Sequence, residues 1–237
     1  MMVGQSKLHY HNVFSKGTDS DCLRYWAPSF ILPKDHLLRK NTLLTTLPTL
    51  TKEWRVSFEF NPKSFNYNGY AQILQMTIGG KGGKVGDRTP ALWIHKSKGV
   101  YIVTTLNGKA NVGKFFPTNK LPIGKWSALE ISQTKRGTMY MFSFLINSET
   151  VWTQENTKPK QFSDVHVFAS SGWYVAQAGF IRGFKIENMI PGIKNRNSLT
   201  FLLLTLVGSY FLSTNSELIT TCCLNLITLQ PLLPQPL

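Results

Sequence analysis

The sequence has little cysteine, and its charged residues never form a long run. Only three of its 237 residues are cysteine, Cys22, Cys222 and Cys223, and two of these are adjacent. This spacing predicts neither a disulfide framework nor a zinc site. Charged residues make up 16% and hydrophobic residues 42% of the chain, a composition that excludes both a disordered polyelectrolyte and a wholly membrane-embedded protein.

The sequence also lacks the carboxylate pair that glycoside-cleaving enzymes require. Residues 51–197 contain eight acidic residues, and no two of them alternate on one predicted strand. Glu59 and Glu130 are each isolated. We therefore predict that the protein is not an enzyme and needs no cofactor, an interpretation that would change if Glu59 and Glu130 faced one another across a cleft.

A secretory signal is not evident at the start of the chain. The first residues, MMVGQSKLHYHNVF, contain no apolar run of about 7–15 residues. Two explanations remain open: the protein is intracellular, or its true start lies upstream of this sequence.

Alternating apolar residues predict an all-β domain. One face of the strand at 53–60 carries Trp54, Val56, Phe58 and Phe60, and one face of 138–146 carries Tyr140, Phe142, Phe144 and Ile146. Further strands are expected at 41–50 (ending at Pro48), 72–78, 100–106, 109–116, 125–132, 164–169 and 179–187. In 72–78 the alternation indicates one wet face, and in 125–132 a slip of phase after Trp126 indicates a β-bulge.

These strands, with frequent turn signals and no amphipathic helix, predict a two-sheet antiparallel jelly roll or β-sandwich. We expect an irregular N-terminal segment (1–41), the sandwich domain (42–190) and an apolar C-terminal tail (191–237). Residues 199–212 are uncharged but shorter than the ~20 residues that span a bilayer. The tail is therefore a short membrane segment at 199–213, a removed lipid-anchor signal or an aberrant C-terminus.

The net charge of +14 comes mainly from residues 51–197, which contain twenty basic side chains. Such a surface favours polyanions, including sulfated glycans and anionic lipids. It is also compatible with an ordinary solvated, lysine-rich face, because the lysines are scattered. We expect no specific nucleic-acid partner.

Residues 79–88, GGKGGKVGDR, are similar in composition to a phosphate-binding loop. No helix pattern follows them, however, so the helix N-terminus that would hold a phosphate is missing. The glycines instead predict a mobile or tightly folded loop between strands. Within it, Asp87 either ligates Ca²⁺ together with backbone carbonyls or forms a turn interaction with Arg88.

Two further positions carry chemistry that the strand pattern does not explain. Trp173 and Tyr174 lie in a loop-like stretch, where they either stack on sugar rings or plug a buried gap. His95 has no partner at metal-ligand spacing and is interpreted as a strand-end residue.

Four stretches in this order, WRVSFEFNPKSF, QILQMTIGGKGGKVGDRTPALWI, LPIGKWSALEISQ and FSDVHVFASSGWY, resemble the concanavalin A-like lectin/glucanase superfamily. The resemblance is to the single-domain laminin-G-like sandwiches of invertebrate extracellular and cell-surface proteins, and it covers residues 42–188. Relatives carry a cysteine pair around the hairpin at Asn107-Gly108. Val103 and Gly113 occupy those places here, so no bridge is expected.

The resemblance implies a non-catalytic module that binds glycans or glycoconjugates, with Ca²⁺ in some branches, and an extracellular or membrane-associated location. The alternative that it implies is an adhesion domain that binds a protein partner through a sheet face. The candidate ligand-binding residues are Lys84, Asp87, Arg88, Trp173 and Tyr174.

Overall fold

The structure is a computed structural model and describes residues 24–191 apart from 67 and 81. The three cysteines and the predicted membrane segment at 199–213 lie outside the described residues. Among the residues that are described, no helix has the length and apolar character needed to cross a bilayer.

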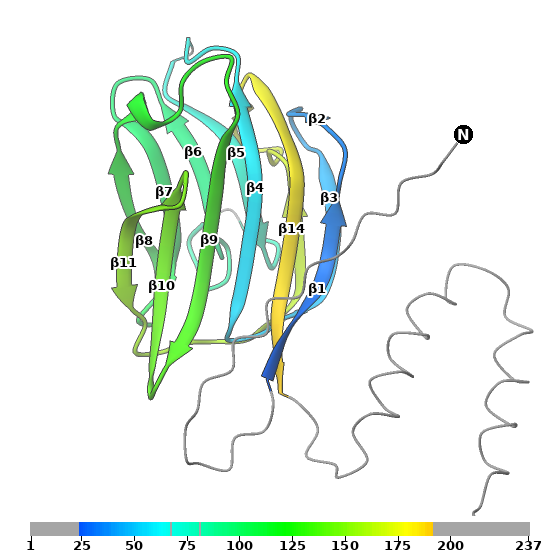
Figure 1. Cartoon of the computed structure of the whole chain (residues 1–237), viewed down its shortest axis with the longest axis vertical. Coiled ribbons are helices and arrows are strands. Elements are labelled where there is room, and N and C mark those ends of the chain that lie inside the picture. The colour runs from blue at the N-terminus through cyan, green and yellow to red at the C-terminus, as the bar shows by residue number, and fades with distance from the viewer. Residues whose placement is uncertain (1–23, 67, 81, 192–237) are drawn as a thin grey trace, which may run out of the picture. The chain divides into compact units, whose positions relative to one another are not determined.

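Two antiparallel sheets of seven strands each pack face to face (Figure 1). Sheet A contains, in spatial order, β1 (Arg24–Leu32), β14 (Gly179–Pro191), β4 (Trp54–Pro62), β9 (Ser127–Arg136), β10 (Met139–Ile146) and β11 (Glu149–Glu155), with β2 (His36–Leu37) paired to β14. Sheet B contains β3 (Leu43–Leu50), β12 (Phe162–Phe168), β5 (Tyr70–Thr77), β6 (Ala91–His95), β7 (Gly99–Leu106) and β8 (Lys109–Phe116). The short β13 (Val175–Ala176) pairs with β5 in parallel. A 3₁₀ turn, η1 (Thr118–Lys120), precedes β9.

The predicted apolar ladders lie in the core between the sheets, except Tyr140, which is only half-buried at the start of the second ladder. Trp54, Val56, Phe58 and Phe60 of β4 are at most 3% exposed. Phe142 of β10 packs against Trp54 and Trp152, with ring centroids 6.4 and 4.9 Å apart. Burial of each large side chain contributes roughly 1.5–3 kcal/mol, so these ladders hold the two sheets together. The predicted sandwich is confirmed.

The segment expected to be irregular contains the edge strand β1 and the short strand β2. Pro28 lies within β1, which neighbours only β14 in sheet A. Proline is tolerated there because an edge strand leaves N–H positions unpaired. The compact unit spans Arg24–Ile190 and thus starts before residue 42.

The strand that begins near residue 41 also extends further than expected. β3 continues past Pro48 to Leu50 and pairs only with β12. Pro48 is exposed, as expected for proline in an edge strand.

The bulge predicted near Trp126 does not form. β9 keeps an unbroken register with both β4 and β10, because the strand begins at Ser127, after the tryptophan. The Trp126 ring instead lies against Arg182, whose guanidinium carbon is 4.1 Å from the ring centroid. β14 bends at Gly183, since the register of the strand shifts between Arg182 and Lys185 and Gly183 has φ +56°.

Two tight hairpins join neighbouring strands. Asn107 and Gly108 join β7 to β8 with φ values of 55° and 74°, and Asn147 and Ser148 join β10 to β11 with 50° and 65°. Paired positive φ values suit the right-handed twist of the flanking strands.

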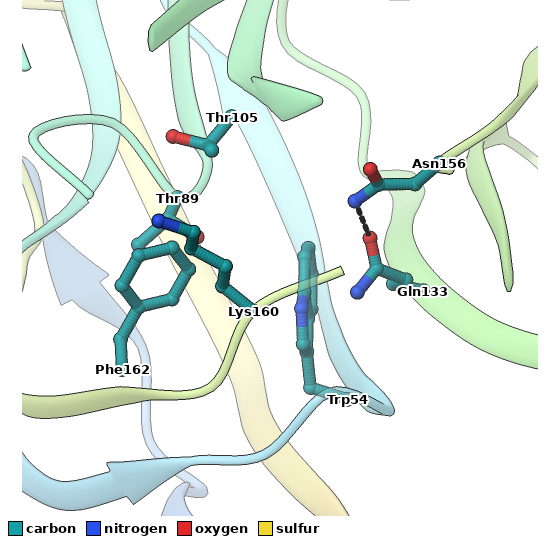
Figure 2. A pocket seen from close by; sticks show the side chains of 7 residues that line it. All are labelled: Trp54, Thr89, Thr105, Gln133, Asn156, Lys160 and Phe162. Carbon is teal, nitrogen blue, oxygen red and sulfur yellow. Dashed lines mark hydrogen bonds between the residues drawn. The ribbon is translucent and has the colours of Figure 1, made fainter. Parts of the chain in front are cut away.

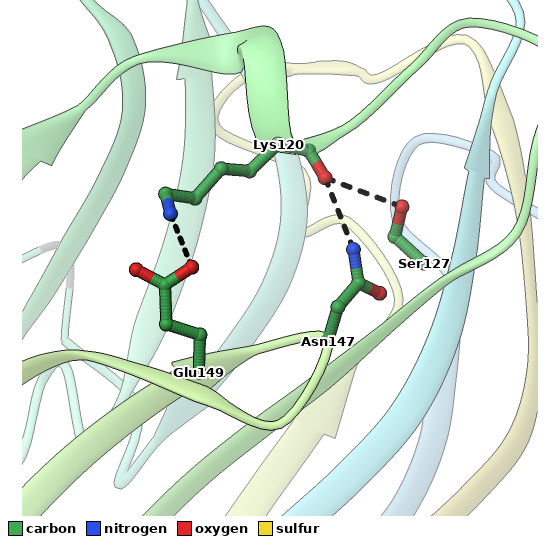
Figure 3. A network of polar contacts seen from close by, with 4 residues as sticks. All are labelled: Lys120, Ser127, Asn147 and Glu149. Carbon is green, nitrogen blue, oxygen red and sulfur yellow. Dashed lines mark hydrogen bonds and ion pairs between the residues drawn. The ribbon is translucent and has the colours of Figure 1, made fainter.

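The second hairpin is anchored to η1 (Figure 3). The carbonyl of Lys120 accepts hydrogen bonds from Asn147 Nδ2 at 3.3 Å and from Ser127 Oγ at 3.5 Å. The Lys120 ammonium pairs with Glu149. These contacts fix the end of sheet A at which β9 begins.

Candidate functional site: an aromatic face on sheet B

Three aromatic residues form a row across the outer face of sheet B. Trp93 of β6 pairs directly with Tyr101 of β7, and Tyr101 pairs with Phe115 of β8. The centroids of the first two rings are 5.9 Å apart, and Tyr101 stacks on Phe115 at 4.1 Å and 16°. Because side chains alternate along a strand, their neighbours Leu92 and Ile102 face the core. We call these three residues the ring row.

Three more rings border the row. Tyr70, at the start of β5, lies 5.7 Å from Tyr101. His95 lies 4.7 Å from Tyr70 and 6.1 Å from Phe115. Tyr174 lies 5.6 Å from Trp93 and 6.2 Å from Tyr70, with both pairs edge to face. We call the six residues together the aromatic face.

The aromatic face is open at one end and covered at the other. Phe115 is 38% exposed, whereas Trp93 is 2% exposed. The Trp93 Nε1 atom is buried and has no hydrogen-bond partner in the described part of the chain. A ligand on this face would therefore contact Phe115 and Tyr101 directly, with Trp93 as the floor beneath Tyr174.

A cation lies over each end of the ring row. The guanidinium carbon of Arg88 is 5.0 Å from the Trp93 centroid, and Lys98 Nζ is 5.5 Å from the Phe115 centroid. Both distances are within the range in which a ring attracts a cation. The row is thus flanked by positive charge on both sides.

Arg88 is carried by the glycine-rich loop, which is tightly folded around Asp87. The Asp87 side chain is buried, and its Oδ2 accepts the backbone N–H groups of Gly82 at 3.1 Å and Lys84 at 2.8 Å. Asn111 of β8 accepts a hydrogen bond from Arg88 Nη1 at 3.1 Å and donates one to the carbonyl of Gly82. The loop therefore fixes the position of Arg88.

Two glycines are required for this packing. A Cβ at Gly80 would lie 1.9 Å from Asp87 Oδ1, and a Cβ at Gly82 would lie 2.5 Å from the guanidinium carbon of Arg88. Gly82 also has φ +124°, a conformation that side chains disfavour. The next element is the strand β6 and not a helix, so the loop is no phosphate cradle.

Buried amides connect this loop to the one that carries Tyr174. Gln75 Nε2 donates to the Asp87 carbonyl at 3.2 Å, and Gln72 Nε2 donates to Gln75 Oε1 at 2.7 Å. Gln72 Oε1 accepts from the Ser171 N–H at 2.7 Å. The face of β5 that the alternation indicated to be wet is therefore covered, because both loops fold over it.

The structure brings only some of the predicted ligand-binding residues together. Arg88 and Tyr174 meet at Trp93. Lys84 is exposed in the glycine-rich loop. Trp173 is half-buried, and its backbone N–H donates a hydrogen bond to Ser171 Oγ at 3.4 Å. Asp87 organises the loop by accepting the backbone N–H groups of Gly82 and Lys84.

The alternation of apolar residues along the sequence does not reveal the residues that make up the ring row. The three rings lie at outward-facing positions of the successive strands β6, β7 and β8. That these positions are adjacent in space can be seen only when the register between the strands is known. Burial raises the pKa of the Tyr101 phenol, and the nearby phenols of Tyr70 and Tyr174 raise it further, whereas Arg88 acts in the opposite direction. The charge of Arg88 therefore acts on the Tyr101 phenol, which lies in the middle of the ring row.

The described residues contain no group of three or more metal-ligating side chains. A small cavity lined by Trp54, Gln133 and Lys160, among other residues, measures about 10 Å³ (Figure 2). Beside this cavity Asn156 Nδ2 donates to Gln133 Oε1 at 2.6 Å. Such a space holds about one water molecule.

Glu59 and Glu130 both line a shallow hollow of about 310 Å³ on the outer face of sheet A. Glu130 pairs with Ser57 across β4 and β9, so Glu59 is its diagonal neighbour. Arg182 binds both oxygens of Glu59, at 2.7 and 3.1 Å. Its hydrogen bond lowers the pKa of Glu59, which is the opposite of what a general acid needs.

No family model matches this chain, and no curated protein matches its sequence. Solved structures similar to it include the receptor binding domain of botulinum neurotoxin D, at 13% identity and a TM-score of 0.47, over 78% of this chain and 48% of that one. They also include the serotype D ligand binding domain in complex with N-acetylneuraminic acid, at 13% identity and a TM-score of 0.46, over 76% and 46%.

Domains LG4-5 of the mouse laminin alpha1 chain are similar at 14% identity and a TM-score of 0.42, over 67% of this chain and 42% of that one. The chain thus spans about half of the length of these structures. The fold of this chain follows from the strand pairing described above.

Proposed function

We propose that the domain is a non-catalytic recognition module that binds an acidic glycan on the aromatic face of sheet B. The observation that carries the proposal is the ring row with a cation at each end, Arg88 over Trp93 and Lys98 over Phe115. Exposed rings offer an apolar platform for the C–H face of a sugar. The flanking cations favour sulfate or carboxylate groups. The resemblance of the sequence to extracellular sandwiches supports a location outside the cell.

Binding on this face is proposed to be independent of Ca²⁺. Of the two carboxylate oxygens of Asp87, Oδ2 already accepts two backbone N–H groups. A calcium ion binds six to eight oxygens and would have to displace these bonds. The role of Asp87 in this proposal is to position the glycine-rich loop.

Catalysis is not part of the proposal. The hollow on sheet A contains two carboxylates, but Arg182 engages both oxygens of Glu59. A carboxylate held in this way is hindered as a nucleophile, and its lowered pKa makes it a poor proton donor.

The proposal is tested with a glycan array that includes neutral, carboxylated and sulfated glycans, with and without Ca²⁺. Isothermal titration with sulfated dextran oligosaccharides then measures the affinity. Phe115→Ala should weaken binding about tenfold, as expected for a ring contact of about 1.4 kcal/mol. Met139→Ala, at an apolar residue that is 47% exposed on sheet A, is the matched control and should bind normally.

A protein partner on the same face is the competing function, and the 38% exposure of Phe115 favours it. If no glycan gives a saturable signal while a single protein binds stoichiometrically and Phe115→Ala abolishes that binding, the adhesion function replaces the glycan-binding one.

A further inference from the structure

The aromatic face contains one side chain that can gain a charge near neutral pH. His95 ends β6 and is half-buried. Its ring lies edge-on to Tyr70 of β5 at 4.7 Å and to Phe115 of β8 at 6.1 Å. It therefore lies beside the exposed end of the ring row, where a bound sugar would rest.

We propose that His95 is a third, titratable cation of the aromatic face, so that the domain binds sulfated glycans more tightly as the pH falls. This inference rests on the proposed function. Histidine is the side chain that changes charge between about pH 5 and 8.

The groups that face His95 set the sign of the effect. β5 contributes Tyr70 and β8 contributes Phe115, while the turn that follows β6 contributes Lys96, Ser97 and Lys98. None of the described contacts of His95 is with Asp or Glu. A proton on His95 therefore adds positive charge that no acidic neighbour neutralises, and an anionic ligand supplies the missing counter-charge.

The hydrogen bond at His95 links the proton to the turn. His95 Nδ1 accepts the backbone N–H of Ser97 at 3.3 Å, and the N–H of Lys98 donates to the His95 carbonyl at 3.3 Å. When imidazole is protonated, both ring nitrogens are donors. Nδ1 then loses its bond to Ser97 and becomes a donor for a sulfate oxygen, in the turn that carries Lys98.

The affinity of the domain for acidic glycans should therefore depend on pH, and its affinity for neutral glycans should not. Affinity for a sulfated glycan should rise by roughly three- to tenfold between pH 8 and pH 5.5, the range expected for one additional partly exposed charge contact. Affinity for a neutral glycan of the same length should not rise.

The test is isothermal titration of the whole chain with sulfated dextran oligosaccharides from pH 5.5 to 8. Sulfate esters stay ionised throughout, so the ligand does not change charge. His95→Gln should lose the gain, so that its affinity at pH 5.5 equals its own affinity at pH 8. The matched control is His166→Gln, at a half-buried histidine of β12 whose ring contact is Phe168, and it should keep the gain. Thermal unfolding of each variant verifies that it is folded.

The outcomes separate the two proposals. Binding that is equally tight at all pH values, or a low-pH gain that persists in His95→Gln, would overturn the role of His95 and leave the binding function intact. Absence of binding at every pH would overturn both. As a second readout, the NMR signals of the His95 ring should titrate at higher pH when the oligosaccharide is bound, and an unchanged titration would contradict the inference.

Discussion

The guanidinium carbon of Arg88 lies 5.0 Å from the centroid of the Trp93 ring, on which the edge of Tyr174 also rests. This contact joins two loops that are more than eighty residues apart in the sequence. It converts the covered end of sheet B into a fixed, positively charged border of the aromatic face.

Arg88→Gln should raise the pKa of Tyr101 further. Burial and the Tyr70 phenol already hold this pKa above its ordinary value of 10.0, and Arg88 partly opposes them. Without the cation, the phenolate loses a favourable neighbour. The measurement is a spectrophotometric titration of Arg88→Gln, with the same variant carrying Tyr101→Phe subtracted. A lower pKa in the variant would show that Arg88 acts mainly by excluding water.

Asp87→Ala should loosen the glycine-rich loop and weaken glycan binding. The substitution leaves the N–H groups of Gly82 and Lys84 without their acceptor, which should cost about 2 kcal/mol of unfolding free energy. Chemical denaturation measures the loss. Glu155→Ala, at an exposed acid on β11, is the control and should be nearly neutral. Unchanged glycan affinity in a destabilised Asp87→Ala would contradict the positioning role of the loop.

The ion pair between Glu59 and Arg182 should stabilise the folded protein near neutral pH and lose this contribution at acidic pH. The pKa of Glu59 in the folded protein lies below its ordinary value of 4.5. Its contribution is therefore fully present above the unfolded pKa and is lost as the pH falls through the folded pKa. Melting temperatures of the wild type and Glu59→Gln should converge as the pH decreases from 6 to 3. A constant difference across that range would show that the pair does not contribute.

Phe142→Ala should be the most damaging of the four substitutions. Its ring is fully buried and contacts both Trp54 and Trp152, so truncation leaves a cavity between the sheets and should cost about 3–5 kcal/mol. Tyr140 lies two residues earlier on the same face of β10 and is only half-buried. Tyr140→Ala should therefore reduce the free energy of unfolding clearly less. Equal losses would argue against a single core shared by the two sheets.

The alternation of apolar residues was sufficient to predict the sandwich and both core ladders, because burial of one face is a local property of each strand. The strand β1 was missed because Pro28 interrupts its pattern, and only the sheet order reveals that it occupies an edge. Edge position is a tertiary property that no local pattern contains.

The ring row depends on register, and register depends on a bulge. The turn at Asn107-Gly108 pairs Leu106 with Lys109, and an unbroken ladder from there would place Lys114 opposite Tyr101. The register shifts by one residue between Thr104 and Leu106, so Phe115 takes that place. A shift of one residue exchanges the two faces of a strand, which is why the aromatic face could not be predicted from the hairpin alone.

The first and last long strands of the domain, β1 and β14, are neighbours in sheet A, and the start of β1 lies at the same end of that sheet as the end of β14 (Figure 1). A protein fused before β1 or after β14 is thus attached at the same end of sheet A, whereas the aromatic face lies on sheet B. The domain can accordingly be grafted into a host protein or immobilised on a sensor through this end without obstructing the face where binding is proposed.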